Sequence, residues 1–480
     1  MSNGQDQNQS ISMPSLGDVN RIYFIGIGGI GMSALARYFH SKGVAVSGYD
    51  KTETPLTQVL VQEGIPVHYT DDAGLAPKDA DLVVYTPAVP QEQTELVYYR
   101  THGYPVVKRS DVLGAITGTA FNICIAGTHG KTTTTTMVAH LLRHSGHGSN
   151  AFLGGISANY DTNFWSNPNN VCVVEADEYD RSFLKLNPDI AVITSMDADH
   201  LDIYGNEASM QDAFVGFGNK VKHGGLLLTK FGLKRTREIA ASRKWTYSLG
   251  NDAADVYATD IRIGEGGYTF NVVLPGETIN NLALNIGGMH NVENAIAAVA
   301  VAHALEIDAD RIKAALAAFR GVHRRFEYII PPQPKEAGGY VYPVLIDDYA
   351  HHPTELTALL KSAASLFPQR KLTVIFQPHL YSRTKDFANE FAVSLALAEH
   401  IILLPIYPAR EVPIEGVSSE MILDKIDRSN KQVLDKKALL DWAAHYAGTM
   451  DKEFGEVIIT AGAGDIDALV QPLKEIFSKA

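Results

Sequence analysis

Cysteine is almost absent from this chain, since only Cys124 and Cys172 occur among its 480 residues. Both lie in apolar, strand-like stretches, and no Cys-x-x-Cys pair is present. A fold held together by disulfides and a cysteine-rich zinc site are therefore excluded. We expect two buried thiols in a protein from a reducing compartment.

Positive charge is also in deficit. The chain has 41 Lys and Arg residues against 54 Asp and Glu residues, which gives a formal net charge of −13. A chain this acidic is not attracted as a whole to nucleic acid or to an anionic membrane surface. A phosphate-bearing ligand must therefore meet local basic side chains or backbone N–H groups, and we expect neither nucleic acid nor membrane as a partner.

Long hydrophobic runs are missing as well. No stretch approaches the roughly 18 consecutive apolar residues that a membrane-spanning helix needs. The first twenty residues are polar and rich in Gln, Asn and Ser, without the apolar segment of a signal peptide. We expect a cytoplasmic protein with a disordered tail over residues 1–19.

What is present is a regular alternation of apolar strand-like runs and amphipathic helical stretches, which predicts an α/β fold with largely parallel sheets. At about 150 residues per domain the length favours about three domains. We predict domains at residues 20–118, 119–325 and 326–480. Within residues 257–286 the pattern changes to alternation with Gly-rich turns, which predicts antiparallel strands added to a parallel sheet.

The segment AGTHGKTT at residues 126–133 follows a strand-like run and opens a helix. This is the setting of a phosphate-binding loop, because glycines let backbone N–H groups approach phosphates and the helix N-terminus adds partial positive charge. Lys131 is predicted to reach the β- and γ-phosphates of ATP, and Thr132 to offer its hydroxyl to Mg²⁺. The loop is shorter than the full GxxxxGK[ST] pattern, where Ile125 occupies the first glycine position.

A second glycine-rich segment, GIGGIGMS at residues 26–33, also lies between a strand and a helix and satisfies GxGxxG. Asp50 ends the next predicted strand about 20 residues on, where an acidic side chain binds a ribose hydroxyl in dinucleotide-binding folds. Taken alone, the segment predicts a nucleotide diphosphate, and NAD is the default. An NAD-dependent oxidoreductase is therefore one alternative, and a phosphate-loop switch protein is another.

Polar side chains follow several other predicted strands. Glu175 and His200 come after neighbouring strands, at the edge where α/β sheets bind ligands, and they are candidate ligands of a hard cation beside a triphosphate. Three further polar clusters end strands of the last domain, at residues 347–353, 377–383 and 407–411. Because these strands share one sheet, their ends are predicted to form one substrate crevice.

Together these motifs resemble the Mur ligases of peptidoglycan synthesis. The resemblance rests on residues 26–33, 127–133, 175–178, 199–200, 288–294, 324–326 and 348–355. It implies a Rossmann-like N-terminal domain for a UDP-sugar, a central P-loop ATPase domain and a C-terminal Rossmann-like domain for the incoming amino acid. It also implies that the GxGxxG loop binds the diphosphate of a UDP-sugar and not NAD.

The implied reaction is an ATP-dependent, Mg²⁺-dependent ligation in cell wall biogenesis, a process on which cell shape and division depend. The segments at residues 376–379 and 381–383 resemble the family members that join L-alanine to the lactoyl carboxylate of UDP-N-acetylmuramate through an acyl phosphate. The nearest alternative is a recycling ligase that adds a tripeptide to the same UDP-sugar. We expect a monomer or a weak homodimer.

The resemblance also assigns individual residues. Those implied to bind ATP are Gly127, Thr128, His129, Gly130, Lys131, Thr132, Thr133, Asn294, Arg325 and Asp348. Those implied to bind the UDP-substrate are Gly26, Gly28, Gly29, Gly31, Met32, Ser33, Asp50 and Ser182. The amino acid is assigned to Tyr349, His351, His379 and Arg383, and Mg²⁺ to Thr132, Glu175 and His200. Lys131, His351 and Arg383 are the implied catalytic residues, with His351 the candidate base for the amine.

The chain departs from the family pattern at two places. Many relatives carry Arg after the Gln-Pro-His triplet, where this chain has Leu380, so Arg383 or Arg410 is expected to bind the amino acid's carboxylate instead. Some Mur ligases use a carbamylated lysine beyond the His200 position. Residues 213–218 contain no lysine, and we predict that this modification is absent.

Overall fold

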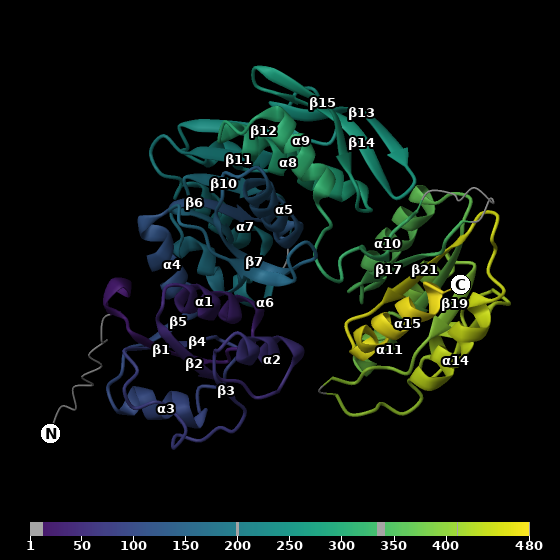
Figure 1. The fold of residues 1–480 in the computed structure, drawn as a ribbon, viewed down its shortest axis with the longest axis horizontal. Helices are drawn as coiled ribbons and strands as arrows, with labels where there is room; N and C mark the ends of the chain where they lie inside the picture. The colour runs from purple at the N-terminus through teal and green to yellow at the C-terminus, as the bar shows by residue number, and fades with distance from the viewer. Residues whose placement is uncertain (1–12, 198–200, 334–340, 410, 480) are drawn as a thin grey trace.

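The computed structural model describes residues 13–197, 201–333, 341–409 and 411–479. It consists of three α/β domains arranged in chain order, each built on its own sheet (Figure 1). The α/β class predicted from the alternation of strands and helices is therefore confirmed.

The N-terminal domain is a five-stranded, fully parallel sheet in the order β3-β2-β1-β4-β5, flanked by helices. Its elements are η1 (Leu16–Asp18), β1 (Arg21–Ile25), α1 (Ile30–Ser41), β2 (Ala45–Tyr49), α2 (Pro55–Gln62), β3 (Val67–His68), β4 (Leu82–Tyr85), α3 (Thr94–Thr101), β5 (Val106–Lys108) and α4 (Arg109–Thr119). The glycine-rich loop connects β1, the central strand, to α1.

The central domain has a ten-stranded sheet in the order β15-β14-β13-β12-β11-β10-β6-β9-β7-β8. Its elements are β6 (Phe121–Ala126), α5 (Lys131–His144), β7 (Asn150–Ser157), β8 (Thr162–Trp165), β9 (Val171–Glu175), η2 (Tyr179–Lys185), β10 (Ile190–Ile193), α6 (Leu201–Tyr204), α7 (Glu207–Gly218), β11 (Leu226–Lys230), η3 (Thr236–Glu238), β12 (Arg243–Ser248), β13 (Val256–Gly264), β14 (Gly267–Leu274), β15 (Glu277–Leu284), α8 (Met289–Ala304) and α9 (Ala309–Ala318). As predicted, β13, β14 and β15 pair antiparallel at one end of an otherwise mainly parallel sheet.

The C-terminal domain has a six-stranded sheet in the order β16-β17-β21-β18-β19-β20, parallel except for β16. Its elements are β16 (Glu327–Ile330), β17 (Val344–Asp348), α10 (Pro353–Leu366), β18 (Lys371–Phe376), α11 (Tyr381–Asp386), α12 (Ala388–Leu395), β19 (His400–Leu403), α13 (Glu420–Leu423), β20 (Lys431–Val433), α14 (Lys436–Ala447), β21 (Glu456–Ala461), η4 (Asp465–Leu469) and α15 (Val470–Phe477). The late strand β21 lies between β17 and β18, so the ends of all three face the same edge.

The N-terminal and central domains share a hydrophobic core, because α1 packs on β7 and β8. The ring of Tyr38 on α1 lies 5.4 Å from that of Phe152 and 6.0 Å from that of Phe164. A buried polar contact accompanies this packing, since Asn163 donates to the Ser33 hydroxyl at 2.9 Å. The glycine-rich loop is therefore held directly against the central domain.

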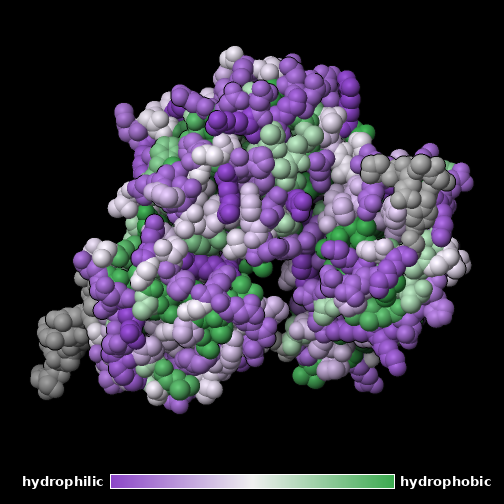
Figure 2. Space-filling view, viewed as in Figure 1, coloured by the Kyte–Doolittle hydropathy of each residue, from purple (hydrophilic) through white to green (hydrophobic). Residues whose placement is uncertain are grey.

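The C-terminal domain has a different kind of contact with the rest of the chain. It meets the β13–β14 turn through Tyr328, whose hydroxyl donates to the Gly266 carbonyl at 3.1 Å, and through an ion pair between Arg370 and Glu265. In this view it is separated from the N-terminal domain by an open gap (Figure 2). None of the helices in the described ranges combines the length and apolarity of a membrane span.

Candidate functional site

The phosphate-binding loop connects β6 to α5, with both of its glycines at positive φ. Gly127 has φ +138° and Gly130 has φ +80°. A Cβ on Gly127 would lie 2.0 Å from the Thr194 hydroxyl, and one on Gly130 would lie 2.8 Å from Oδ1 of Asn294. Backbone conformation and space therefore both require glycine here, and the loop places the N-terminus of α5 at the edge of the sheet.

The end of β10 supports this loop. The hydroxyls of Thr128 and Ser195 are 2.8 Å apart, and the backbone N–H of His129 donates to Ser195 at 2.8 Å. The Thr128 hydroxyl also accepts from the N–H of Asp197 at 3.2 Å. Thr128 is thus buried in the loop's own hydrogen bonds, whereas the side chain of His129 is largely exposed.

Lys131, the first residue of α5, does not extend freely into solvent. Its Nζ donates to the carbonyl of Gly127 and to Oε1 of Glu178, both at 2.7 Å. The Glu178 side chain is fully buried and that of Lys131 is 14% exposed. The ammonium is therefore fixed at the mouth of the loop by a buried carboxylate that the sequence prediction did not assign.

Thr132 and Glu175 come together as predicted for a cation site. The Thr132 hydroxyl donates to Oε1 of Glu175 at 3.0 Å, and the N–H of Gly154 donates to Oε2 at 3.1 Å. Burial raises the pKa of Glu175, and the nearby Lys131 opposes this shift. These oxygen donors suit a hard cation such as Mg²⁺. His200 lies outside the described residues, and within those residues no group of three or more His, Cys, Asp or Glu side chains is arranged to hold a metal ion.

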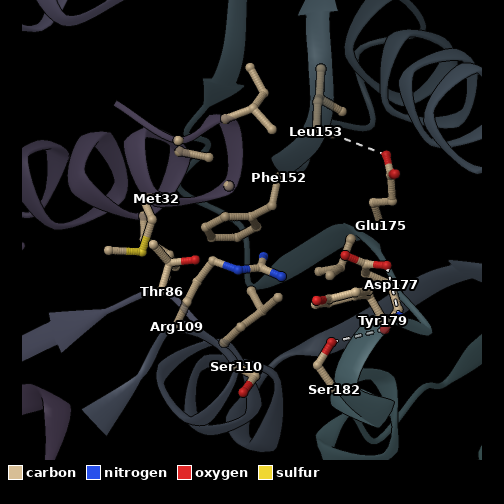
Figure 3. A pocket seen from close by; sticks show the side chains of 18 of the residues that line it. Met32, Thr86, Arg109, Ser110, Phe152, Leu153, Glu175, Asp177, Tyr179 and Ser182 are labelled. Carbon is tan, nitrogen blue, oxygen red and sulfur yellow. Dashed lines mark hydrogen bonds between the residues drawn. The ribbon is translucent and has the colours of Figure 1, made fainter. Parts of the chain in front are cut away.

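A pocket of about 600 Å³ lies between the N-terminal and central domains and reaches both glycine-rich loops (Figure 3). From the N-terminal domain it is lined by Gly29, Gly31, Met32 and Arg109, among others, and from the central domain by Thr132, Phe152, Glu175 and Ser182. Arg325, from the connection to the third domain, also lines it. A ligand in this pocket would touch the start of α1 at one end and the candidate cation site at the other.

Three predicted residues of the first glycine-rich loop do not line this pocket. Gly26 forms the turn after β1, and the N–H of Gly28 donates to Oδ2 of Asp50 at 2.8 Å, so Asp50 braces the loop from the end of β2. Ser33 is fully buried against Asn163 and also donates to the carbonyl of Ile30. The structure therefore gives Ser33 a role in domain packing and does not bring it to the pocket.

Asn294 lies next to Gly130 of the phosphate-binding loop. It is on the first turns of α8, buried, with Oδ1 close to Gly130, and its amide donates to Asn291 at 3.1 Å. Asn291 in turn donates to the carbonyl of Gly287 at 2.6 Å. This chain of amides fixes the Asn294 side chain next to the N-terminus of α5.

The connection between the central and C-terminal domains is strained. Arg324 and Phe326 both have positive φ, +59° and +47°, and they flank Arg325, which lines the pocket. The carboxylate of Asp348 accepts from the N–H groups of Phe326 and Ala350, both at 2.7 Å. Burial raises the pKa of Asp348 to about 6. In this conformation Oδ2 of Asp348 fastens the connection at Phe326, and Oδ1 holds the turn after β17 at Ala350.

The residues assigned to the amino acid gather at the strand ends of the C-terminal domain. The rings of His351 and His379 are 6.1 Å apart, and the His379 ring stacks on Tyr407 at 5.8 Å. Nδ1 of His379 and Nη1 of Arg383 are both buried without a hydrogen-bond partner. Burial and the neighbouring Arg383 lower the pKa of His379. These two polar atoms, on residues four positions apart in the sequence, therefore retain unused hydrogen-bonding capacity.

Leu380 and Glu411 shape the start of α11 beside this cluster. Leu380 takes the helix N-cap position with φ +70°, which is strained for a non-glycine residue. Glu411 accepts from the backbone N–H of Ser382 at 2.9 Å, and hydrogen bonds from Ser382 lower its pKa. Arg410, the alternative partner for a carboxylate, is outside the described residues.

The structure thus forms two groups of predicted residues and leaves them apart. Among the described residues, no hydrogen bond or ion pair joins the His379 and Arg383 cluster to the phosphate-binding loop. Sequence reasoning missed Glu178 and Arg109. Glu178 belonged to an acidic strand end that was already noted, and Arg109 follows β5 directly, so attention to strand ends would have found both.

Comparison with known proteins agrees with this geometry. Residues 21–120 match the Mur ligase family catalytic domain, residues 125–302 the Mur ligase middle domain, and residues 324–464 the Mur ligase glutamate ligase domain. The matches cover all three domains.

Among curated relatives, the UDP-N-acetylmuramate–L-alanine ligase of Porphyromonas gingivalis is 46% identical over 464 residues, covering 95% of this chain and 99% of that protein. The enzyme of the same name from Cytophaga hutchinsonii is 46% identical over 469 residues, covering 96% and 97%.

Among solved structures, the UDP-N-acetylmuramate–alanine ligase of Thermotoga maritima is 30% identical, with a TM-score of 0.76 and coverage of 96% of this chain and 99% of that one. A murein peptide ligase from Psychrobacter arcticus, 23% identical with a TM-score of 0.63, shares the fold. With three matching domains and relatives this similar along nearly their whole length, the chain belongs to the Mur ligase family.

Proposed function

We propose that this protein joins L-alanine to the lactoyl carboxylate of UDP-N-acetylmuramate with cleavage of ATP. The observation that carries the proposal is the pocket between the first two domains, which spans from the start of α1 to Thr132 and Glu175. A UDP-sugar lying along it would place its carboxylate next to the phosphate-binding loop. The names of the relatives that align over nearly the whole chain support the same reaction.

A carboxylate does not condense with an amine in water, because its oxygen is a poor leaving group. Transfer of the γ-phosphoryl group of ATP to this carboxylate makes an acyl phosphate. Two anions have to approach in this step, so positive charge is needed between them. Lys131 supplies one charge, and Glu178 holds its ammonium at the loop before the substrates arrive. The phosphates of ATP would meet the N-terminus of α5.

Mg²⁺ fits the oxygen donors of Thr132 and Glu175, and when bound it would neutralise further charge on the phosphates. Asn294, next to Gly130, is placed to contact the nucleotide. Arg325 would add a guanidinium at the end of the pocket where the carboxylate reacts.

The amine of L-alanine then attacks the acyl phosphate and displaces phosphate. We assign the alanine carboxylate to Arg383, whose buried Nη1 lacks a partner, and the amine to the neighbourhood of His351 and His379. Burial favours neutral His379, which could accept a proton. Because no hydrogen bond or ion pair joins this cluster to the loop within the described residues, catalysis requires the C-terminal domain to move toward the pocket. The strained connection at residues 324–326 is the place for that motion.

The test is release of phosphate from ATP in the presence of UDP-N-acetylmuramate and one acceptor at a time: L-alanine, glycine, L-serine or the tripeptide of the recycling ligases. We expect turnover to be fastest with L-alanine and to require both co-substrates. A preference for the tripeptide would replace the proposal by the recycling reaction. Nicotinamide binding without ATP cleavage would replace it by an oxidoreductase.

A further inference from the structure

Arg109 is the first residue of α4, and its side chain points into the pocket between the N-terminal and central domains (Figure 3). Among the described residues its guanidinium has neither a hydrogen bond nor an ion pair. An arginine that lines a pocket without a protein partner is available to an anionic ligand.

The carboxylates around Arg109 are engaged elsewhere. Asp111, on the same helix, pairs with Lys185 at 2.5 Å and accepts from the N–H of Lys108 at 3.0 Å. Across the pocket, Glu175 accepts from Thr132 and Gly154, and Asp177 accepts from the N–H of Tyr179 at 3.1 Å. Each of these three carboxylates already accepts a hydrogen bond, and none of them forms an ion pair with Arg109 within the described residues.

The guanidinium lies directly over the glycine-rich loop. A Cβ on Gly31 would be 2.8 Å from Nη1 of Arg109, 3.2 Å from its Cδ and 3.2 Å from its Cζ. Gly31 is the second residue of α1, so Arg109 is next to the first turn of that helix, where backbone N–H groups have no intrahelical acceptor. A guanidinium and a helix N-terminus that face the same space both favour a negative charge there.

We propose that Arg109 binds the diphosphate of the UDP-substrate, holding it against the N-terminus of α1. This rests on the proposed function, because it takes the UDP-sugar as the ligand of the pocket. The lactoyl carboxylate is the other anion of that substrate, but it has to reach Thr132 and Glu175 in the central domain. The location of Arg109 over Gly31 assigns it to the diphosphate. It also accounts for a glycine at position 31, since a side chain there would displace Arg109.

The experiment compares the affinities of four ligands by calorimetry: uridine, UDP, UDP-N-acetylglucosamine and UDP-N-acetylmuramate. The variants are Arg109→Ala and Arg109→Lys. Arg21→Ala is the matched control, because Arg21 is a partly exposed arginine of the same domain that pairs with Asp79 at 3.3 Å. UDP-N-acetylglucosamine carries the diphosphate but no lactoyl carboxylate, so it separates the two anions.

We expect Arg109→Ala to weaken binding of the three diphosphates by the same factor, roughly 10- to 100-fold, which is the range for one charge-assisted hydrogen-bonded contact. Uridine binding and the KM for ATP should not change. Arg109→Lys should lose less, because it keeps the charge and loses only the bidentate geometry. The Arg21→Ala control should match the unsubstituted protein.

Unchanged affinity for UDP in Arg109→Ala would overturn the proposal, and so would a loss confined to UDP-N-acetylmuramate, which would assign Arg109 to the carboxylate. If Arg109→Ala were unfolded, Arg109→Lys with full affinity for all three diphosphates would overturn the proposal equally. Failure of the unsubstituted protein to ligate L-alanine would instead refute the proposed function, and the UDP comparison would remain valid.

Discussion

Nζ of Lys131 lies 2.7 Å from Oε1 of Glu178, so the lysine of the phosphate-binding loop is paired with a fully buried carboxylate. The pair holds the ammonium beside Gly127, where the phosphates of ATP would arrive. Removing the carboxylate would leave the charge of the lysine without its anchor, and removing the lysine would take the opposite charge away from a buried acid.

We predict that Lys131→Ala abolishes ligation while binding of the UDP-substrate persists. Lys131 is assigned to the phosphates of ATP, whereas the diphosphate of the UDP-substrate is assigned to the end of the pocket that the N-terminal domain lines. Calorimetric titration with UDP-N-acetylmuramate and a phosphate-release assay should be run on the same preparation. Because Lys131→Ala also removes side-chain volume beside the buried Glu178, Lys131→Met is a useful companion that retains packing volume. Near-normal turnover in either variant would refute the role of Lys131.

Glu175→Ala should raise the Mg²⁺ concentration needed for half-maximal activity by at least roughly 10- to 100-fold, the range found when a residue that supports a metal ligand is removed. His200→Ala, from the same predicted set, should do likewise. Since burial raises the pKa of Glu175, protonation should compete with Mg²⁺, and the requirement should increase as the pH falls. Mg²⁺ titrations at several pH values measure both effects. Curves that coincide with those of the unsubstituted protein would exclude these ligands.

Arg383→Ala should raise the KM for L-alanine by roughly 10- to 150-fold, the equivalent of a charge-assisted contact of about 1.5–3 kcal/mol. The KM values for ATP and UDP-N-acetylmuramate should stay nearly constant. Leu380 cannot share the carboxylate, so we expect the upper part of this range. Lys385→Ala, on the same short helix α11, is the matched control.

Arg383 could alternatively only support α11 through Asp386 or Glu390, but no ion pair with either forms among the described residues. Under that alternative, thermal stability would fall slightly and the alanine KM would stay the same. An unchanged KM for L-alanine would exclude Arg383 as the residue that binds the alanine carboxylate and would leave Arg410 as the candidate.

The pH dependence of stability is predicted to contain a contribution from Glu95, which is fully buried and accepts a 2.6 Å hydrogen bond from the hydroxyl of Tyr23. Burial raises its pKa from 4.5 to about 7. Between these values the folded state keeps a proton that the unfolded state releases. The contribution of Glu95 to stability therefore declines as the pH rises from about 4.5 to about 7.

Glu95→Gln removes this titration. Relative to the unsubstituted protein, its free energy of unfolding should improve by up to roughly 3 kcal/mol between pH 4.5 and pH 7.5, at about 1.4 kcal/mol per pKa unit. Denaturant unfolding of the whole chain across this range measures the difference. Glu92→Gln changes an exposed neighbour, and its difference in free energy of unfolding from the unsubstituted protein should not vary with pH. If the difference for Glu95→Gln also did not vary with pH, the prediction would be contradicted.

The local features of this protein follow from its sequence by itself. Glycines at residues 127 and 130 sit between an apolar strand and a helix, and their positive φ values and close neighbours are what a phosphate-binding loop requires. The antiparallel strands between residues 256 and 284 could be expected from alternation alone. These features depend on side-chain periodicity and on backbone conformations available to few residue types. A short stretch of sequence determines both properties.

Only the tertiary structure decided which residues meet. Ser33 lies in a motif that predicts phosphate contact, yet the packing of α1 against the central domain turns it toward Asn163. Arg109 carries no motif, but the parallel order of the first sheet brings it over Gly31. Glu178 reaches Lys131 from 47 residues along the chain. Such contacts are set by the packing of whole elements against one another, which a local pattern does not encode.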